Sequence, residues 1–453
     1  MYKRQPIIIL LFATVLVVSV AACKKWVDVT PPLQVNENTV FANEQGFHEV
    51  LNGVYLKMSD TSLYGRELTL GLLSVLGRSY DTSITPAIKN VYYQCARYNF
   101  QDADVKTSFA RIWEGMYQCI ANVNYALASA ESRKELFGSG RNYNAFKGEA
   151  LGLRAFLYFD LVRMFAPSPI LDPNSISVPY ITQVSPYGSP AMETSAVIDS
   201  CIADLVTAQS LLPATDVNVS HITSAGVKGL LTRIYLYKGD LANAQGTAMD
   251  LINSKQFPLA TNSNDAMFQK EHLFSLYNYS PGVIYRSVLS TNPPLGLTLA
   301  GQTALFVTGG GSAFEWRKTF NDPATGTTSG TNLISPRKYW GTSTVSNANV
   351  LPMIRMSEMY YIAAECAVAL KDSLTATNLM DTIRVHRGLV KYTQAALKND
   401  SLTTEIGREY QKEFLSEGQV FYYFKRRNLP FNTLPFTKVP TIAGASYVFI
   451  KPE

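Results

Sequence analysis

The sequence predicts a mainly α-helical protein in which paired helices form a scaffold that carries an irregular, loop-rich part with little β-structure. Two long stretches, about residues 41–255 and 351–427, repeat apolar residues at helical spacing. Between them, residues 256–350 lose that period and become rich in Gly, Thr, Ser, Asn and Pro. With 47% hydrophobic and 17% charged residues among 453, the composition excludes a disordered chain. A net charge of +5 without basic clusters gives no sign of a nucleic-acid-binding surface.

The N-terminal residues have the pattern of an exported protein. A positively charged start precedes an apolar stretch from Ile7 to Ala22, which is shorter than the roughly 20 residues of a membrane-spanning helix. The stretch ends in small residues followed by Cys23. This resembles the lipobox of bacterial lipoproteins, in which the cysteine thiol is lipidated, for example with palmitate. We therefore expect a signal peptide over residues 1–22 and a lipid anchor and tether over residues 23–40, with ordinary cleavage before Cys23 as the alternative.

Each predicted helix follows from an amphipathic pattern. The pattern indicates helices at about residues 44–59, 108–132, 143–165, 194–212, 224–238, 241–254, 355–370 and 375–386. Pro167 and Pro213 follow the third and fourth of these helices and end them. Residues 60–107 are less regular.

Two helical pairs repeat one another at an offset of 132 residues. Leu231 corresponds to Ala363 and Asp240 to Asp372, and each pair consists of a helix, a two-residue turn and a second helix. Paired helices of about 34 residues are the tetratricopeptide unit, which buries its apolar face only by stacking on neighbours. We therefore expect residues 41–453 to form a single domain on a tetratricopeptide-like helical repeat scaffold.

The sequence lacks the usual motifs of catalysis. Its four histidines have no metal-ligand spacing, and it contains no nucleophile elbow and no phosphate-binding loop. Glu409, Glu413 and Glu417 are spaced for one helix face, which favours a salt-bridged structural network over a glycosidase pair. The basic residues expected nearby are Arg408, Lys412, Arg426 and Arg427. We expect no catalytic residue, no metal and no cofactor.

Four cysteines remain after Cys23. Cys201 and Cys366 lie on the apolar faces of predicted helices, so we predict buried thiols there. Export would permit disulfides, and the disulfide state of all four, Cys95 and Cys119 included, stays open.

Several local patterns together resemble the SusD/RagB family of outer-membrane nutrient-binding lipoproteins. The most specific is the stretch from Glu149 to Val162, which is close to the family's E-A-x-x-L-R-A-x-x-Y-F-D-L-V. The other matching motifs, in the family's order, are Cys23 with its proline-bearing tether, Phe41 with Gly53-x-Tyr55, Trp113-x-x-x-Tyr117-x-x-Ile120-x-x-x-Asn124, Arg355 to Glu365, Arg384 to Gly388, and Glu413 to Gly418 with Arg426. These are scaffold motifs that span nearly the whole chain and identify the fold, not the ligand. Tyr410 and Val420 depart from the family, which usually has arginine there.

The resemblance implies a non-catalytic, lipid-anchored protein of the outer membrane, facing the cell exterior, that binds an oligosaccharide or polysaccharide. It also implies a partner, a SusC-like TonB-dependent outer-membrane transporter that receives the ligand. In this family the helical repeats face the transporter and the irregular loops build the ligand face. A peptide-binding member with the same transporter and a repeat scaffold for protein partners only are the alternatives.

Candidate ligand residues follow from the chemistry of sugars. Sugars present CH-rich faces that pack on aromatic rings, and hydroxyl edges that hydrogen-bond to Asn, Asp or Arg. The aromatic-rich segments 78–100 and 277–340, which we expect to be poor in helix, supply this mixture. Within them we select Tyr80, Asp81, Trp316, Arg317, Tyr339 and Trp340. Trp113 and Tyr117 lie on a helix stripe and are predicted to be core residues.

Overall fold

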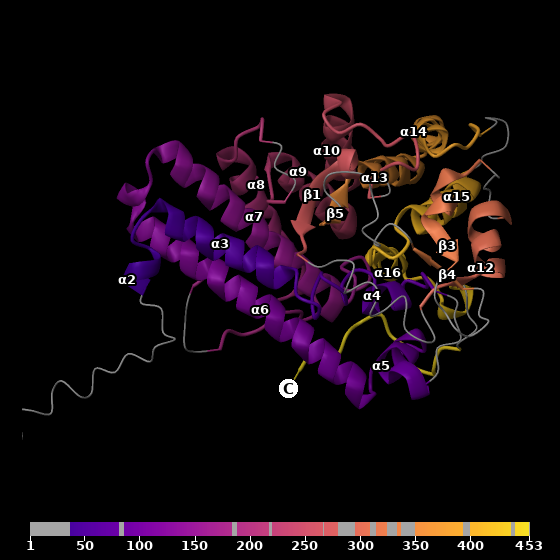
Figure 1. Ribbon diagram of the computed structural model, residues 1–453, viewed down its shortest axis with the longest axis horizontal. Helices are drawn as coiled ribbons and strands as arrows, with labels where there is room; N and C mark the ends of the chain where they lie inside the picture. The colour runs from indigo at the N-terminus through magenta and orange to yellow at the C-terminus, as the bar shows by residue number, and fades with distance from the viewer. Residues whose placement is uncertain are drawn as a thin grey trace, which may run out of the picture.

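The computed structural model describes residues 37–80, 86–183, 188–216, 220–265, 267–279, 295–308, 314–323, 333–336, 349–392, 399–435 and 440–452 (Figure 1). The longer helices are α3 (Glu44–Met58), α5 (Pro86–Ala96), α6 (Ala103–Ser132), α7 (Gly140–Phe165), α8 (Thr194–Leu211), α9 (Ser224–Lys238), α10 (Leu241–Ser254), α13 (Met356–Ala369), α14 (Ser373–His386), α15 (Asn399–Glu413) and α16 (Gln419–Arg426). Shorter helices are α2 (Glu37–Val40), α4 (Leu72–Leu76) and α12 (Leu299–Thr303). The strands are β1 (His272–Tyr277), β2 (Leu297–Thr298), β3 (Asn321–Pro323), β4 (Leu333–Pro336) and β5 (Val350–Arg355). Single turns of 3-10 or π-helix occupy Lys134–Leu136, Gln269–Glu271, Ala304–Thr308, Trp316–Phe320 and Phe431–Thr433.

The predicted helices are present, and the chain is mainly α-helical as predicted. Helices α9 and α10 begin and end at the predicted residues. Helix α6 begins earlier than predicted because the Asp102 carboxylate accepts the backbone N–H groups of its first turn. The expectation of irregular structure is wrong for α5, which begins at Pro86, where the fixed φ of proline suits a first helical residue.

The scaffold helices pack against one another in chain order. Helices α3, α6 and α7 lie side by side, and α8, α9, α10, α13 and α14 continue the array across the molecule (Figure 1). Every residue of α7 from Ala150 to Phe165 is buried. A helix buried on all sides must be covered on all sides, and α3, α6, α8 and α9 all contact α7. Within the described ranges, none of the helices has the combination of length and apolar character that crossing a membrane requires.

The predicted repeat is visible in the caps of two helical pairs. Helix α10 begins after Asp240 and α14 after Asp372, and each carboxylate accepts the backbone N–H three residues later, from Asn243 at 3.2 Å and from Thr375 at 3.0 Å. Helix α10 also packs against α13, so the pairs α9–α10 and α13–α14 stack on each other. This arrangement confirms a helical repeat scaffold.

The inserted part carries the short strands predicted for it. Strand β1 pairs antiparallel with β5, which places Tyr277 opposite Val350 and joins the two ends of the insertion. A second antiparallel sheet has the order β2-β4-β3 and contacts α12. It lies with α12 and α15 at one end of the molecule (Figure 1).

The four cysteines of the described part are free and buried. The predicted buried thiols at Cys201 and Cys366 are therefore confirmed. Burial raises the pKa of the Cys119 and Cys366 thiols to about 12, so neither is reactive at neutral pH. Trp113 and Tyr117 are half-buried and pack against the main hydrophobic core.

Charged side chains form a buried ionic cluster beside this core. Its members are Arg317, Arg355, Arg384, Arg387, Lys412, Glu271, Glu315, Glu409, Glu413 and Glu417, so positive and negative charges balance. Glu413 lies at its centre: one carboxylate oxygen accepts from Arg355 and Arg387, both at 2.7 Å, and the other accepts from Arg317 at 2.8 Å. Burial opposes ionisation, but these arginines outweigh it and hold the pKa of Glu413 well below its usual range.

The structural network predicted for the three glutamates is confirmed, but most of its predicted partners are wrong. Lys412 does pair with Glu409. Arg408 pairs instead with Glu405, and Arg426 and Arg427 pair with Glu365. Glu417 is not on the helix of the other two, because α15 ends at Glu413. Gly418 follows Glu417 in the turn between α15 and α16. It has φ +76°, and a Cβ there would lie 2.4 Å from the Leu68 carbonyl oxygen, so only glycine fits this turn.

Candidate functional site

Two exposed tyrosines stand at the end of β1, and we call them the tyrosine pair. Tyr277 is 45% exposed and Tyr279 is 72% exposed, although β1 is buried up to Leu276. Their ring centroids lie 5.0 Å apart with an interplanar angle of 84°, an edge-to-face contact. Side chains two residues apart in an extended chain point to the same side. The two rings therefore form one aromatic surface on the non-helical part of the molecule.

The backbone beneath the tyrosine pair is fixed to the scaffold. The Asn278 N–H donates to the Asn349 carbonyl at 2.7 Å, which extends the β1–β5 pairing beyond Tyr277. The Asn349 side-chain amide also donates to the Tyr277 hydroxyl at 3.4 Å. Strand β5 runs directly into α13, so the position of the pair is set by the repeat helices.

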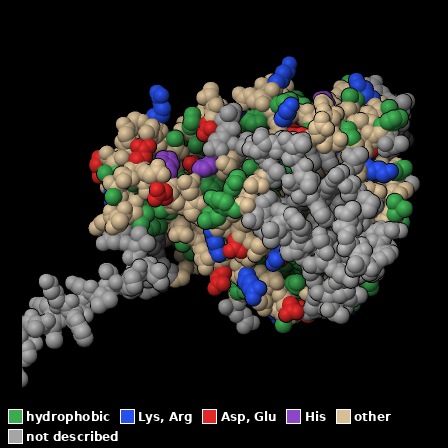
Figure 2. All heavy atoms as spheres, in the orientation of Figure 1, with side chains coloured by type: hydrophobic (Ala, Val, Ile, Leu, Met, Phe, Trp, Pro, Cys, Tyr) green, Lys and Arg blue, Asp and Glu red, His purple; other side chains and the backbone are tan. Residues whose placement is uncertain are grey.

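This arrangement offers the two contacts that a sugar requires. The exposed rings present flat apolar faces, and the phenol and amide groups beside them donate and accept hydrogen bonds. Among the described side chains on the face drawn in Figure 2, positive and negative groups are interspersed and no large patch of one sign forms. Within the described ranges, no three His, Cys, Asp or Glu side chains are grouped as metal ligands.

Trp316, selected from the sequence, is half-buried. Its indole N–H donates to the His386 carbonyl at 2.8 Å, and its ring lies 5.8 Å from the ring of Phe268. Gly388 lets the backbone at Phe314 lie close to the end of α14. It has φ +81°, and a Cβ there would lie 2.3 Å from the Phe314 carbonyl oxygen. One face of Trp316 is thus used in packing, while the neighbouring Phe314 is 81% exposed.

Tyr80 and Arg317, also selected, lie inside the protein. Tyr80 is 5% exposed, and its hydroxyl donates to the Leu70 carbonyl at 2.6 Å. Arg317 is 2% exposed, and its guanidinium is bound by Glu315, Glu409 and Glu413 of the ionic cluster. A guanidinium that is buried and held by three carboxylates is not accessible to a sugar. We therefore assign both residues structural roles and do not retain them as ligand residues.

The remaining selections, Asp81, Tyr339, Trp340 and the lipidation candidate Cys23, lie outside the described residues. Sequence reasoning did not select Tyr277 or Tyr279. The available signal was their place in the aromatic-rich insertion. Only the strand register shows that both rings face outward. Trp316, Trp340 and Arg317 were selected because their side chains can contact sugars, whatever their exposure.

A groove along α6 is a second place where a ligand could lie. It has a volume of about 410 Å³, within the usual range for ligand pockets, and Tyr117, Tyr125 and Gln183 are among its lining residues. The Tyr117 hydroxyl donates to the Pro179 carbonyl at 2.9 Å, and the Asn124 amide donates to the Ile181 carbonyl at 2.6 Å. These polar groups hold the chain after α7 against α6 and therefore serve the fold.

A histidine links three scaffold helices near the surface. His221 Nδ1 lies 2.7 Å from a carboxylate oxygen of Glu149 on α7, and the same oxygen accepts the Tyr55 hydroxyl of α3 at 2.8 Å. His221 lies three residues before Ser224, the first residue of α9. Burial lowers the pKa of His221, but the hydrogen bond and charge of Glu149 outweigh burial and raise it.

This contact predicts a pH-dependent stability. Because the folded-state pKa of His221 is raised, its contribution is full below the unfolded pKa of about 6.5 and is lost as pH rises through the folded value. We expect the melting temperature of the wild type to exceed that of His221→Gln most at pH 5.5, with the difference shrinking toward pH 8.5. Thermal melts of both proteins across this range check it, and a difference independent of pH would contradict it.

Comparisons with known proteins identify a family that shares this helical repeat scaffold. A family profile described as "Starch-binding associating with outer membrane" matches residues 25–236, and the profile of the SusD family matches residues 252–434. SusD-like protein P2 of Formosa agariphila is 29% identical over 248 residues. That alignment covers 52% of this chain and 46% of the relative, so it spans about half the length of each.

Solved structures share the fold across most of the chain. A SusD-like carbohydrate binding protein from Bacteroides vulgatus has a TM-score of 0.68 at 20% identity and covers 85% of this chain and 83% of its own. A SusD superfamily protein from Bacteroides thetaiotaomicron has a TM-score of 0.69 at 21% identity. The match covers 85% of this chain and 89% of that protein's chain. The chain belongs to the SusD/RagB family, as its motifs predicted.

Proposed function

We propose that this protein binds an oligosaccharide or polysaccharide without altering it, and that the tyrosine pair is the centre of the binding surface. The observation that carries the proposal is the exposure of two fixed, contacting aromatic rings on the loop-rich part of the fold. Family membership supports the ligand class, since one matching profile is described as starch-binding and a structural relative as carbohydrate binding.

The tyrosine pair favours a glycan over a peptide. A peptide bound in extended form would use main-chain pairing at a free strand edge and pockets for alternate side chains, whereas an exposed aromatic ring suits the face of a sugar ring. Calorimetric titration with a panel of neutral and acidic oligosaccharides and of peptides of similar length tests the choice. We expect at least one glycan to bind and to be recovered intact, and a protein that bound peptides alone would support the alternative.

We further propose that the protein is anchored by a lipid on Cys23 at the outer membrane, facing the cell exterior, and that it passes its ligand to a SusC-like TonB-dependent transporter. The helical repeats supply a surface for such a partner. Ile170 and Leu171 after α7, Leu370 after α13, and Leu374 in α14 are each more than half exposed. Ile170 lines a groove of about 310 Å³ across the turns of the two helical pairs.

Replacing Cys23 by serine tests the anchor. We expect Cys23→Ser protein made in a bacterium that processes lipoproteins to lose labelled palmitate and to leave the membrane fraction, because a thiol is needed for the lipid linkage. Cys95→Ser is the matched control, since Cys95 is buried in the folded body and is expected to leave labelling unchanged. Equal labelling of wild type and Cys23→Ser would contradict the anchor but not the glycan site.

A further inference from the structure

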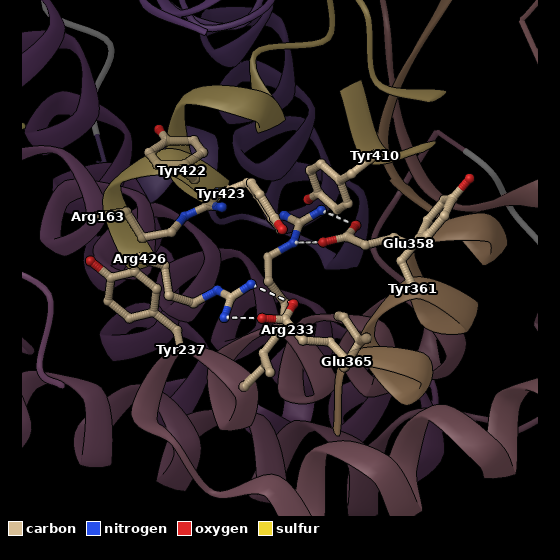
Figure 3. Close-up of a pocket in the computed structure, with 12 residues that line it drawn as sticks. Arg163, Arg233, Tyr237, Glu358, Tyr361, Glu365, Tyr410, Tyr422, Tyr423 and Arg426 are labelled. Carbon is tan, nitrogen blue, oxygen red and sulfur yellow. Dashed lines mark hydrogen bonds and ion pairs between the residues drawn. The ribbon is translucent and has the colours of Figure 1, made fainter. Parts of the chain in front are cut away.

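A small cavity lies where the two halves of the scaffold meet, and we call it the arginine cavity (Figure 3). Its lining comes from α7 and α9 of the N-terminal half and from α13, α15 and α16 of the C-terminal half. Its volume is about 30 Å³, which exceeds the roughly 10–15 Å³ that one water-sized particle requires. It is too small for a sugar and is separate from the tyrosine pair.

The charge lining the arginine cavity is positive. Arg163, Arg233 and Arg426 line it, against two carboxylates, Glu358 and Glu365. Arg233 is bidentate on Glu358, with N–O distances of 2.7 and 2.6 Å, and Arg426 is bidentate on Glu365, at 2.9 and 2.7 Å. Both carboxylates are therefore already paired, and Glu365 serves Arg427 as well.

Arg163 is the third arginine of the lining. It pairs with Asp160, which does not line the cavity, through Nε and Nη2, and its Nη1 donates to the Gln419 side-chain oxygen at 3.3 Å. Its guanidinium also lies 3.7 Å from the ring centroid of Tyr422. With Asp160 counted, the three lining arginines pair with three carboxylates, and Arg427, which shares Glu365 with Arg426, gives this group one excess positive charge.

One donor of this lining has no acceptor. Nη1 of Arg233 is buried and has no hydrogen-bond partner among the described residues, and a buried, charged N–H group without an acceptor destabilises the folded state. Figure 3 shows Arg163 and Arg233 extending toward one another across the middle of the cavity. The hydroxyls of Tyr237, Tyr361 and Tyr422 also lack partners, but in Figure 3 they point away from the space between the two arginines.

We propose that the arginine cavity binds one monovalent anion of halide size, such as chloride, between Arg163 and Arg233. Guanidinium groups only donate hydrogen bonds, so two of them facing one space require an acceptor, and a negative ion also offsets the charge of the lining. Carboxylate- or sulfate-bearing molecules exceed the volume. The bound ion would link Arg163 of α7 to Arg233 of α9, and Arg233 in turn is held by Glu358 of α13. Its role would be to fix this arginine at the junction of α7, α9 and α13. The inference does not depend on the proposed glycan binding.

Thermal melts of the full folded domain at constant pH and ionic strength test the proposal. Sodium gluconate is exchanged stepwise for sodium chloride or sodium bromide. We expect a saturable rise in melting temperature with either halide, because a ligand at 100 times its dissociation constant raises the folded-to-unfolded ratio about 100-fold. A melting temperature that is the same in gluconate and in halide would overturn the proposal.

Crystals grown in bromide give the direct readout, an anomalous difference peak between Arg163 and Arg233. A water molecule alone at that position would also overturn the proposal. The double variant Arg233→Met with Glu358→Leu removes the donor and its partner together and is expected to lose the halide response. Arg154→Met with Asp204→Leu removes another bidentate pair, at 2.7 Å in both contacts, outside the lining of this cavity, and is expected to keep it. If the Arg233→Met, Glu358→Leu protein does not fold, the wild-type melts and the bromide crystals still test whether the cavity binds a halide.

Discussion

Replacing both members of the tyrosine pair by alanine is expected to lower the affinity for the bound glycan by about 100-fold or more while leaving the fold intact. Truncating an aromatic side chain at a binding hot spot typically costs about 2 kcal/mol, and each 1.4 kcal/mol is a factor of about ten in affinity. Tyr277 and Tyr279 are 45% and 72% exposed, so their removal changes the free energy of unfolding by only about 0.5–1 kcal/mol. Calorimetric titration of the double variant, with a thermal melt alongside, measures both quantities.

The matched control keeps the rings and removes the hydroxyls. The double variant Tyr277→Phe with Tyr279→Phe is expected to retain most of the affinity if stacking dominates, and the loss that remains measures the hydroxyl hydrogen bonds. Trp316→Ala is expected to have a smaller effect on binding than the alanine pair and a larger effect on stability, because its indole is bonded to the end of α14. Wild-type affinity in the Tyr277→Ala, Tyr279→Ala protein would place the ligand elsewhere, with the α6 groove as the next position to examine.

Glu413→Gln is expected to destabilise the protein by about 3–5 kcal/mol, because it leaves buried arginines without a counter-charge. The carboxylate of Glu413 binds Arg317, Arg355 and Arg387, and its exposure is 1%. Glutamine has nearly the same shape, so the loss reports charge and not volume. Urea unfolding at pH 7 gives the difference in the free energy of unfolding.

A surface ion pair provides the comparison for this result. Asp250→Asn breaks the contact of Asp250 with Lys228, in which the aspartate is 64% exposed, and exposed pairs contribute about 0–1 kcal/mol. We expect a small change there. If Glu413→Gln cost no more than Asp250→Asn, the ionic cluster would not be the stabilising centre described here.

Much of the fold could be predicted because its signals are local. Thr223 caps the start of α9, Gly239 ends it with φ +88°, and Asp240 caps the start of its partner α10. A threonine, a glycine and an aspartate at such positions can be recognised in the sequence. Helix α5 was missed although Val91, Tyr92 and Cys95 have helical spacing, because it is short and lies within a segment rich in Ser, Thr, Tyr and Gly. The partners of Glu413 were missed for a different reason: Arg317 and Arg355 are distant in sequence, and only the fold brings them together.

The candidate site was harder to predict because exposure is a property of tertiary packing. Arg317 can donate hydrogen bonds as a ligand residue would, but it forms buried ion pairs with Glu315 and Glu409. Tyr277 and Tyr279 resemble many other tyrosines in the chain until β1 is paired with β5. Sequence reasoning found the part of the molecule that carries exposed rings, whereas the strand register identified which of its rings reach the solvent.

The most direct measurement for the central claim is a calorimetric titration of purified wild-type protein with defined oligosaccharides, followed by mass analysis of the recovered sugar. We predict saturable binding of at least one glycan, loss of that binding when Tyr277 and Tyr279 are changed to alanine, and recovery of the glycan at its original mass. Binding of peptides without any glycan, or recovery of shortened sugar chains, would contradict the account.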